Sequence, residues 1–202
     1  MEKFAGTIEE INPDLLLYGG DIIEGDGEDG KIKQFEDIIR RTKARYGVYG
    51  VLGNHEHYAG QVIRYFFRNS GIGILRDTAV IINNSFIVAG RDDSHFRTRK
   101  SVEETMKALP DSLPVILLDH RPTEIDLISK TTADVVFSGH THHGQLFPIN
   151  FITGSIYELS HGYLKKHNTH FFVTSGIRLW GPPVRTTGKS EIMVVNINLI
   201  TD

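Results

Sequence analysis

The sequence predicts an α/β domain in which two β-sheets pack together. Short apolar strands alternate with amphipathic helices through most of the chain, and a hairpin-like alternation follows towards its end. No linker-like stretch divides the 202 residues, a length that suits one domain with a sizeable core. We therefore expect a single domain over residues 1–202.

The first half of the chain shows the alternation clearly. Phe4, Ile8 and Ile11 recur at helical spacing, and Asn12-Pro13 ends that helix. Asp14–Tyr18 is a short apolar strand of the kind that is buried on both faces. A Gly-Asp-rich loop over 25–30 follows, and then the pattern predicts a helix over 32–45, a strand over 47–52, a helix over 60–69 and strands near 72–75, 78–82 and 85–90.

The second half continues the alternation and then becomes rich in strands. The pattern predicts a helix over 101–108, a strand over 114–118, a short helix over 123–129 and a strand over 134–137. Alternating residues in Tyr157–Leu164 and His170–Ser175 flank a polar turn, which predicts a hairpin. Glu191–Ile200 is the last predicted strand.

Composition excludes several classes of protein. The formal net charge of −3 argues against a nucleic-acid partner. The absence of cysteine excludes disulfides, thiolate nucleophiles and Cys-ligated zinc. The sequence has no apolar run of the roughly 18 residues that a membrane span needs, and its start has no apolar signal region. From the chain alone we expect a cytoplasmic location.

Polar clusters follow four of the predicted buried strands. They are, in chain order, Gly19-Gly20-Asp21, Gly53-Asn54-His55-Glu56, Asp119-His120 and Ser138-Gly139-His140-Thr141-His142. One such residue alone is more often a turn residue or a half-buried histidine. Sites in open α/β sheets lie beyond the carboxyl ends of strands, so four clusters together predict one shared site.

The residue types in these clusters indicate a metal site. In an extended segment, His140 and His142 would point to the same face, and His143 would point away. Oxygen and nitrogen donors without sulfur suit Mn²⁺, Fe²⁺ or Zn²⁺. Donors of this kind occur in sites where two ions about 3.5–4 Å apart clamp a phosphoryl group.

The same residues resemble the motifs of the calcineurin-like metallophosphoesterases. The matches are Gly20-Asp21, Gly53-Asn54-His55-Glu56, His120 and Gly139-His140-Thr141-His142, in family order. Similarity to a bacterial branch extends from about Asn12 to Glu191 and includes Gly90-Arg91-Asp92-Asp93 and Trp180-Gly181-Pro182-Pro183. The resemblance implies a four-layer α/β/β/α sandwich and hydrolysis of phosphoric esters.

The resemblance also implies roles for the matched residues. Two divalent ions (Mn, Fe or Zn) would share Asp21, with His142 on the first ion and Asn54, His120 and His140 on the second. His55 would assist the leaving-group oxygen as general acid, and Glu56, where the family usually has Asp, would orient His55. Arg91, Arg185 and Trp180 are candidate substrate contacts, and for each of them a surface ion pair or a packing role is the favoured alternative.

One family motif has no counterpart in this chain. The family opens with Asp-x-His on its first strand, whereas no histidine precedes His55, and Glu2, Glu9 and Glu10 lie on a predicted helix. We expect an N-terminally incomplete domain that lacks its first strand and retains only Asp21 and His142 at the first metal position. Three explanations stay open: a fragment, a short form that retains only one ion, or a protein that has lost catalysis. A bare sheet edge would also favour self-association.

The expected function is hydrolysis of phosphoric esters, phosphodiesters in particular, by in-line attack of a metal-activated water. The bacterial branch implies that substrates include lipid-linked phosphoesters and that the location is a membrane surface or outside the cell. The alternative is a non-catalytic or single-metal scaffold on the same fold. A zinc hydrolase acting on amides is disfavoured because the chain has no His-Glu-x-x-His motif.

Overall fold

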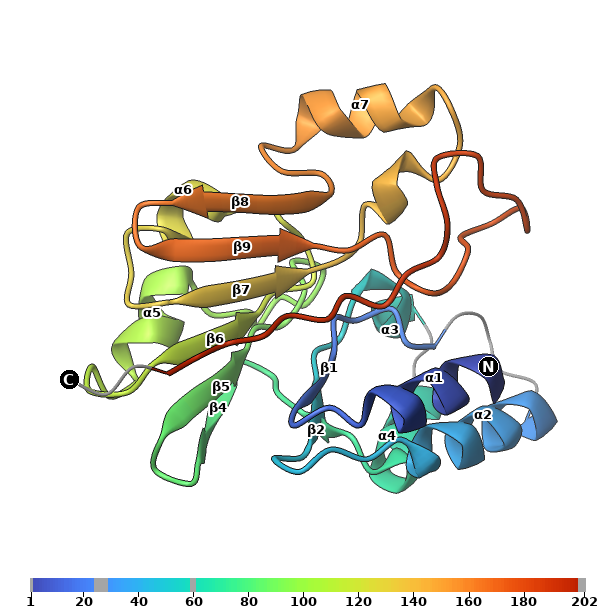
Figure 1. Cartoon of the computed structure of the whole chain (residues 1–202), viewed down its shortest axis with the longest axis horizontal. Helices are drawn as coiled ribbons and strands as arrows, with labels where there is room; N and C mark the ends of the chain where they lie inside the picture. Colours follow the sequence, from blue (N-terminus) through green and yellow to red (C-terminus); the bar gives the residue numbers. More distant parts are fainter. Residues whose placement is uncertain (1, 24–28, 59–60, 200–202) are drawn as a thin grey trace.

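Two β-sheets form the centre of the molecule (Figure 1). The computed structural model describes residues 2–23, 29–58 and 61–199. The smaller sheet is parallel and joins β1 (Leu16–Tyr18), β2 (Val48–Gly50) and β3 (Gly73–Ile74) in that order. These short strands carry the first two polar clusters at their carboxyl ends.

The larger sheet is mixed, with the strand order β4-β5-β6-β7-β9-β8. Its four central strands run parallel, and an antiparallel hairpin forms each edge. The strands are β4 (Thr78–Ile82), β5 (Phe86–Gly90), β6 (Val115–Leu118), β7 (Val135–Ser138), β8 (Gly162–Lys166) and β9 (Thr169–Val173). The third and fourth polar clusters follow β6 and β7.

Helices cover the outer face of each sheet. The smaller sheet is covered by α1 (Glu2–Ile11), α2 (Asp29–Arg41) and α4 (Gln61–Ser70), and the larger sheet by α5 (Val102–Lys107) and α6 (Ile125–Ile128). The alternation along β5 shows how the layers are built, since Ile87 packs towards α5 and α6 while Val88 packs between the sheets. The predicted α/β fold with two packed sheets is confirmed, in the order α/β/β/α.

A cavity of about 850 Å³ separates part of the two sheets. Its apolar wall includes Ile8 of α1, Leu17 of β1 and Phe137 of β7, and residues 191–199 line another side. Asp21, His120, His140 and His142 also line it, so the space between the sheets reaches the polar clusters. β1 is the edge strand beside this cavity, and the predicted self-association through that edge stays a prediction.

Three short helical segments lie where no helix was predicted. They are α3 (Asn54–Tyr58), the 3₁₀ turn η1 (His142–Gly144) and α7 (Ile149–Ile156). The strand predicted for Glu191–Ile200 is wrong over 191–199, which form no ladder, and Ile200 lies outside the described residues. An alternating pattern becomes a strand only where a neighbouring strand offers hydrogen bonds. Residues 25–28 of the predicted loop and residue 60 of a predicted helix also lie outside the described part.

Within the described ranges, no helix is both long enough and apolar enough to cross a lipid bilayer.

Arg91 belongs to the protein interior, which does not fit its expected role as a substrate contact. Its side chain is 1% exposed, and its guanidinium donates to Asp119 at 2.6 Å and to Glu124 at 2.7 Å. Arg99 donates to the same two carboxylates, each at 2.8 Å. Burial raises the pKa of Asp119, and the positive charges of Arg99 and Arg91 oppose that rise. The cluster joins β5 to the start of α6, and these contacts match the alternative role of Arg91 in packing and ion pairing.

Replacing Arg91 tests this structural role. Arg91→Ala would leave Asp119 buried with one guanidinium fewer, and breaking a buried pair costs about 3–5 kcal/mol of unfolding free energy. Urea unfolding followed by circular dichroism measures this loss. Lys130→Ala removes an exposed pair with Asp126 and is the control, with no measurable change expected. A folded Arg91→Ala protein as stable as the wild type would contradict the assignment.

Candidate metal centre

The four polar clusters meet at one edge of the two sheets. Parallel pairing of β1 with β2, and of β6 with β7, places the carboxyl ends of each pair side by side. Backbone bonds prolong the pairing beyond the strands, from Val51 to Tyr18 at 3.1 Å and from Gly139 to His120 at 3.0 Å. The residues that follow each pair of strands are therefore brought together.

Asp21, His120 and His140 form the centre of the site. The Nε2 atom of His120 lies 3.1 Å from Oδ2 of Asp21 and 3.2 Å from Nδ1 of His140. One ligand atom from each of the three residues lies within 4.8 Å of those of the other two. Side chains separated by about 120 positions in sequence thus meet in a group that could hold one metal ion.

The ring orientation of His120 is fixed by the backbone. Its Nδ1 lies 2.6 Å from the carbonyl oxygen of Gly19, so this nitrogen donates its proton to that oxygen. The Nε2 atom then faces Asp21 and His140. Metal-binding histidines are commonly held in this way, with the second ring nitrogen donating to a carbonyl.

The protonation states of the group suit a cation. Burial would raise the pKa of Asp21, but the hydrogen bond and charge of His120 lower it to about 2. Burial and the charge of His120 lower the pKa of His140 to about 3. Burial would lower the pKa of His120, but the hydrogen bond to Asp21 outweighs it and the pKa is raised. Asp21 is thus an anion and His140 a neutral imidazole, which are the forms that bind metals, whereas the raised pKa of His120 favours a proton on its Nε2 that a bound cation would displace.

Asn54 and His142, two further predicted ligands, have polar atoms without partners. Oδ1 of Asn54 and Nδ1 of His142 are both buried and accept no hydrogen bond within the described structure. Buried polar atoms without a partner are costly, and a bound cation would satisfy such acceptors. His142 lines the same cavity, although it lies outside the close group of Asp21, His120 and His140. The donors present therefore fit a divalent cation.

The backbone around the histidines is not extended, contrary to expectation. His140, His142 and His143 have φ angles of 65°, 50° and 53°, and Asp21 has φ 51°. Non-glycine residues in this left-handed region each cost of order 1 kcal/mol, and such residues cluster at functional sites. His140 and His142 are therefore brought to the cavity by a tight left-handed turn. The ring of His143 lies against that of His161, with centroids 4.3 Å apart.

Glu56 has partners other than the expected His55. It is 1% exposed, and its two oxygens accept from the backbone amides of Asp21 at 2.9 Å, Ile23 at 2.9 Å and Gly53 at 2.7 Å. Burial raises the pKa of Glu56, and the amides of Ile23 and Gly53 oppose that rise. The side chain ties the loop after β1 to the loop after β2. Its position three residues after Gly53 resembles a capping box, a signal that could have predicted this role.

His55 lies beside Asp21. Its backbone N–H donates to Oδ1 of Asp21 at 2.9 Å, and its Nε2 lies 4.0 Å from Oδ2 of the same carboxylate. The imidazole is about one-fifth exposed, so it can meet a ligand that enters the site from solvent. The position is compatible with proton transfer to a group bound near Asp21.

The remaining expected substrate contacts, Arg185 and Trp180, lie on one loop. Arg185 donates to the carbonyls of His142 at 3.4 Å, Ser175 at 3.0 Å and Arg178 at 3.1 Å, so its guanidinium supports the histidine turn. The backbone N–H and carbonyl of Trp180 are both bound by the side-chain amide of Gln145. The indole is half exposed, and its contact with substrate stays a prediction.

Replacing Glu56 tests whether its carboxylate holds the loops after β1 and β2 together. Glu56→Gln keeps the shape but places an NH₂ group against backbone N–H groups, so at least one buried donor loses its acceptor. We expect a loss of about 1–3 kcal/mol in unfolding free energy. We also expect Mn²⁺ affinity to fall by about tenfold or more, as for other residues that orient ligands. Urea unfolding and calorimetry measure the two effects.

The matched control is Glu103→Gln, which makes the same change on the exposed side of α5. Glu103→Gln should leave both quantities at their wild-type values. Wild-type stability and metal affinity in Glu56→Gln would show that the hydrogen bonds of the Glu56 carboxylate do not hold the metal centre together.

The chain is similar to known phosphoesterases. The family model described as calcineurin-like phosphoesterase matches residues 1–144. An uncharacterized metallophosphoesterase of Helicobacter pylori is 33% identical over 201 residues, which cover 94% of this chain and 53% of the relative. An uncharacterized metallophosphoesterase of Aquifex aeolicus is 32% identical over 98% of this chain and 77% of the relative.

The fold has a counterpart among solved structures. The crystal structure of TT1561 of Thermus thermophilus superposes with a TM-score of 0.56 at 13% identity, over 85% of this chain and 81% of that one. This likeness concerns the fold alone. The chain spans about half the length of the Helicobacter relative (53%). From the match over residues 1–144 and the Aquifex relative, the chain belongs to the calcineurin-like phosphoesterase family.

Proposed function

We propose that the protein hydrolyses phosphoric esters, phosphodiesters in particular, with a divalent cation bound at Asp21, Asn54, His120 and His140. The proposal rests on the ligand atoms of Asp21, His120 and His140, which all lie within 4.8 Å of one another. Membership of a phosphoesterase family supports the reaction class. Mn²⁺, Fe²⁺ and Zn²⁺ all suit this set of oxygen and nitrogen donors.

The cation would supply Lewis acidity and would lower the pKa of a bound water. The chain's own residues would hold the cation, orient its ligands and donate a proton. The Asp21 carboxylate and the neutral imidazole of His140 supply ligand atoms, and Gly19 keeps Nε2 of His120 turned towards them. His55, with its Nε2 4.0 Å from Asp21, would donate a proton to the departing alkoxide. Most of the catalytic effect in such reactions is positioning and electrostatics.

The number of ions is a separate part of the proposal. Asp21, Asn54, His120 and His140 give one position four protein donors, whereas a second position would share Asp21 and have only His142 besides. We therefore expect one tightly bound ion per chain and a second ion that binds much more weakly. Native mass spectrometry after titration with Mn²⁺ measures both. Two ions retained with equal affinity would contradict this inequality.

The test of the reaction is hydrolysis of bis-p-nitrophenyl phosphate by the purified chain with Mn²⁺. Turnover should be lost on adding EDTA and should return with Mn²⁺. His55→Ala should lower kcat by about a hundredfold or more, because it removes the proton donor. His57→Ala, an exposed histidine on the same helix α3, is the matched control and should keep wild-type turnover.

Two outcomes would count against the proposal in different ways. Undiminished turnover in His55→Ala would remove His55 from the mechanism but leave the metal centre intact. One bound ion per chain without any hydrolysis would favour the alternative, a single-metal scaffold on the same fold. That alternative is motivated by the position of His142 outside the close group of three ligands.

A further inference from the structure

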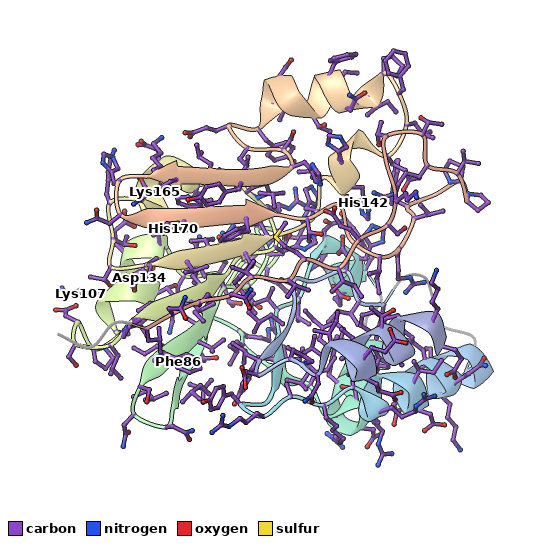
Figure 2. All side chains as sticks on the ribbon, viewed as in Figure 1. Phe86, Lys107, Asp134, His142, Lys165 and His170 are labelled. Atoms are coloured by element: carbon purple, nitrogen blue, oxygen red, sulfur yellow. The ribbon has the colours of Figure 1, made fainter. Side chains whose placement is uncertain are left out.

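Arg121 lies at the same edge of the larger sheet as the metal centre. Parallel pairing of β5, β6 and β7 places the carboxyl ends of these strands side by side. Asp93 comes shortly after β5, and Arg121 directly follows the metal ligand His120. Figure 2 shows the direction of the sheet, with Asp134, just before β7, at one end and His142 at the opposite end. The loops after β5 and β6 therefore lie beside the metal centre.

A buried carboxylate fixes the guanidinium of Arg121. The side chain of Asp93 is 0% exposed, and its Oδ2 accepts from Nε of Arg121 at 2.7 Å. Its Oδ1 accepts from the backbone N–H of His95 at 3.0 Å and lies 2.7 Å from Nδ1 of the same residue. Burial would raise the pKa of Asp93, but the hydrogen bonds from His95 and Arg121 outweigh burial and lower it. Asp93 is therefore an anion that holds Arg121 in one orientation.

This anchoring leaves the outer end of the guanidinium open. Arg76 shows the contrasting arrangement, since it binds Asp92 through both Nε and Nη2, each at 2.8 Å. Arg121 binds Asp93 through Nε alone, and its Nη2 lies 3.0 Å from Nδ1 of His95. Among the described residues, none accepts a hydrogen bond from Nη1 of Arg121, and the side chain is 18% exposed. A ligand that enters the site can therefore reach Nη1.

The charge of Arg121 acts on the metal centre. Burial lowers the pKa of His140, and the positive charge of Arg121 contributes to this shift. The loop that carries His95 also touches α3, because the ring centroids of Tyr58 and His95 are 5.6 Å apart. The same short helix carries His55, the proposed proton donor. Arg121 and His55 therefore both border the space beside the metal ligands.

We propose that Arg121 binds a non-bridging oxygen of the phosphoryl group in the substrate, an inference that rests on the proposed hydrolysis. Guanidinium N–H groups match phosphoryl oxygens in charge and geometry. Because Asp93 already fixes the side chain, binding would immobilise few further torsions. The two candidate arginines from the sequence have other partners, Arg91 binding carboxylates and Arg185 binding backbone carbonyls. Arg121 is better placed than either of them to bind the anionic group of a phosphodiester or of its phosphate product.

Inorganic phosphate tests the site without turnover. Calorimetry measures its affinity for the chain with one equivalent of Mn²⁺ and again after treatment with EDTA. Arg121→Ala should bind phosphate about tenfold to a hundredfold more weakly than the wild type, the usual loss of a hydrogen bond between charged groups. Arg40→Ala changes an exposed arginine on α2 and is the matched control, with unchanged affinity expected. Equal affinities of wild type and Arg121→Ala, or no phosphate binding in either form, would overturn the proposal.

The affinity for Mn²⁺ separates substrate binding from a structural role. Arg121→Ala removes a positive charge next to the metal ligands, so its affinity for Mn²⁺ should stay the same or rise. Arg121→Lys keeps a cation for Asp93 but loses the planar fork, and we expect it to fold and to bind phosphate about tenfold more weakly. A parallel loss of Mn²⁺ and phosphate affinity in both variants would assign Arg121 to the structure of the loop and overturn the proposal.

Failure of this inference differs from failure of the proposed hydrolysis. Hydrolysis of bis-p-nitrophenyl phosphate with an unchanged kcat/KM in Arg121→Ala would overturn the role of Arg121 and leave the reaction in place. Phosphate binding that depends on Arg121, in a chain that hydrolyses no ester, would support the phosphate site and remove the reaction.

Discussion

The metal centre depends on the carboxylate of Glu56. This one buried side chain holds the backbone of Asp21 and Ile23, which follow β1, against Gly53, which follows β2. The carboxylate of Asp21 is thereby fixed between the N–H of His55 and the imidazole of His120. Removal of the Glu56 carboxylate would free the loop that carries Asp21, the only carboxylate in the group of Asp21, His120 and His140.

The two sheets are joined at the same place. His120, which follows β6 of the larger sheet, donates to the carbonyl of Gly19, which follows β1 of the smaller sheet. The approach is so close that a Cβ atom on Gly20 would lie 2.5 Å from Nδ1 of His120. Gly20 also has φ 94°, a conformation that side chains rarely adopt. Glycine is required there because two layers of the fold meet at the ligand group.

The sequence predicted the layers and the gathering of the site, but not the conformation of the loops. Runs such as Val115–Leu118 and Val135–Phe137 form strands that are largely buried on both faces. Their continuous apolar pattern is therefore enough to predict the strands. The left-handed turn at His140–His143 is stabilised by contacts distant in sequence, including the bond from Arg185 to His142, and no local pattern reveals it. For the same reason the strand prediction for 191–199 failed.

The proposed function requires that Asp21, His120 and His140 share one cation. The most direct measurement is anomalous X-ray diffraction from crystals of the chain grown with Mn²⁺. We predict one strong peak bounded by the carboxylate of Asp21 and the imidazole nitrogens of His120 and His140, with Asn54 completing the coordination. Crystals in which these side chains stay hydrogen-bonded to one another at high Mn²⁺, with no peak between them, would show that they do not form a metal site.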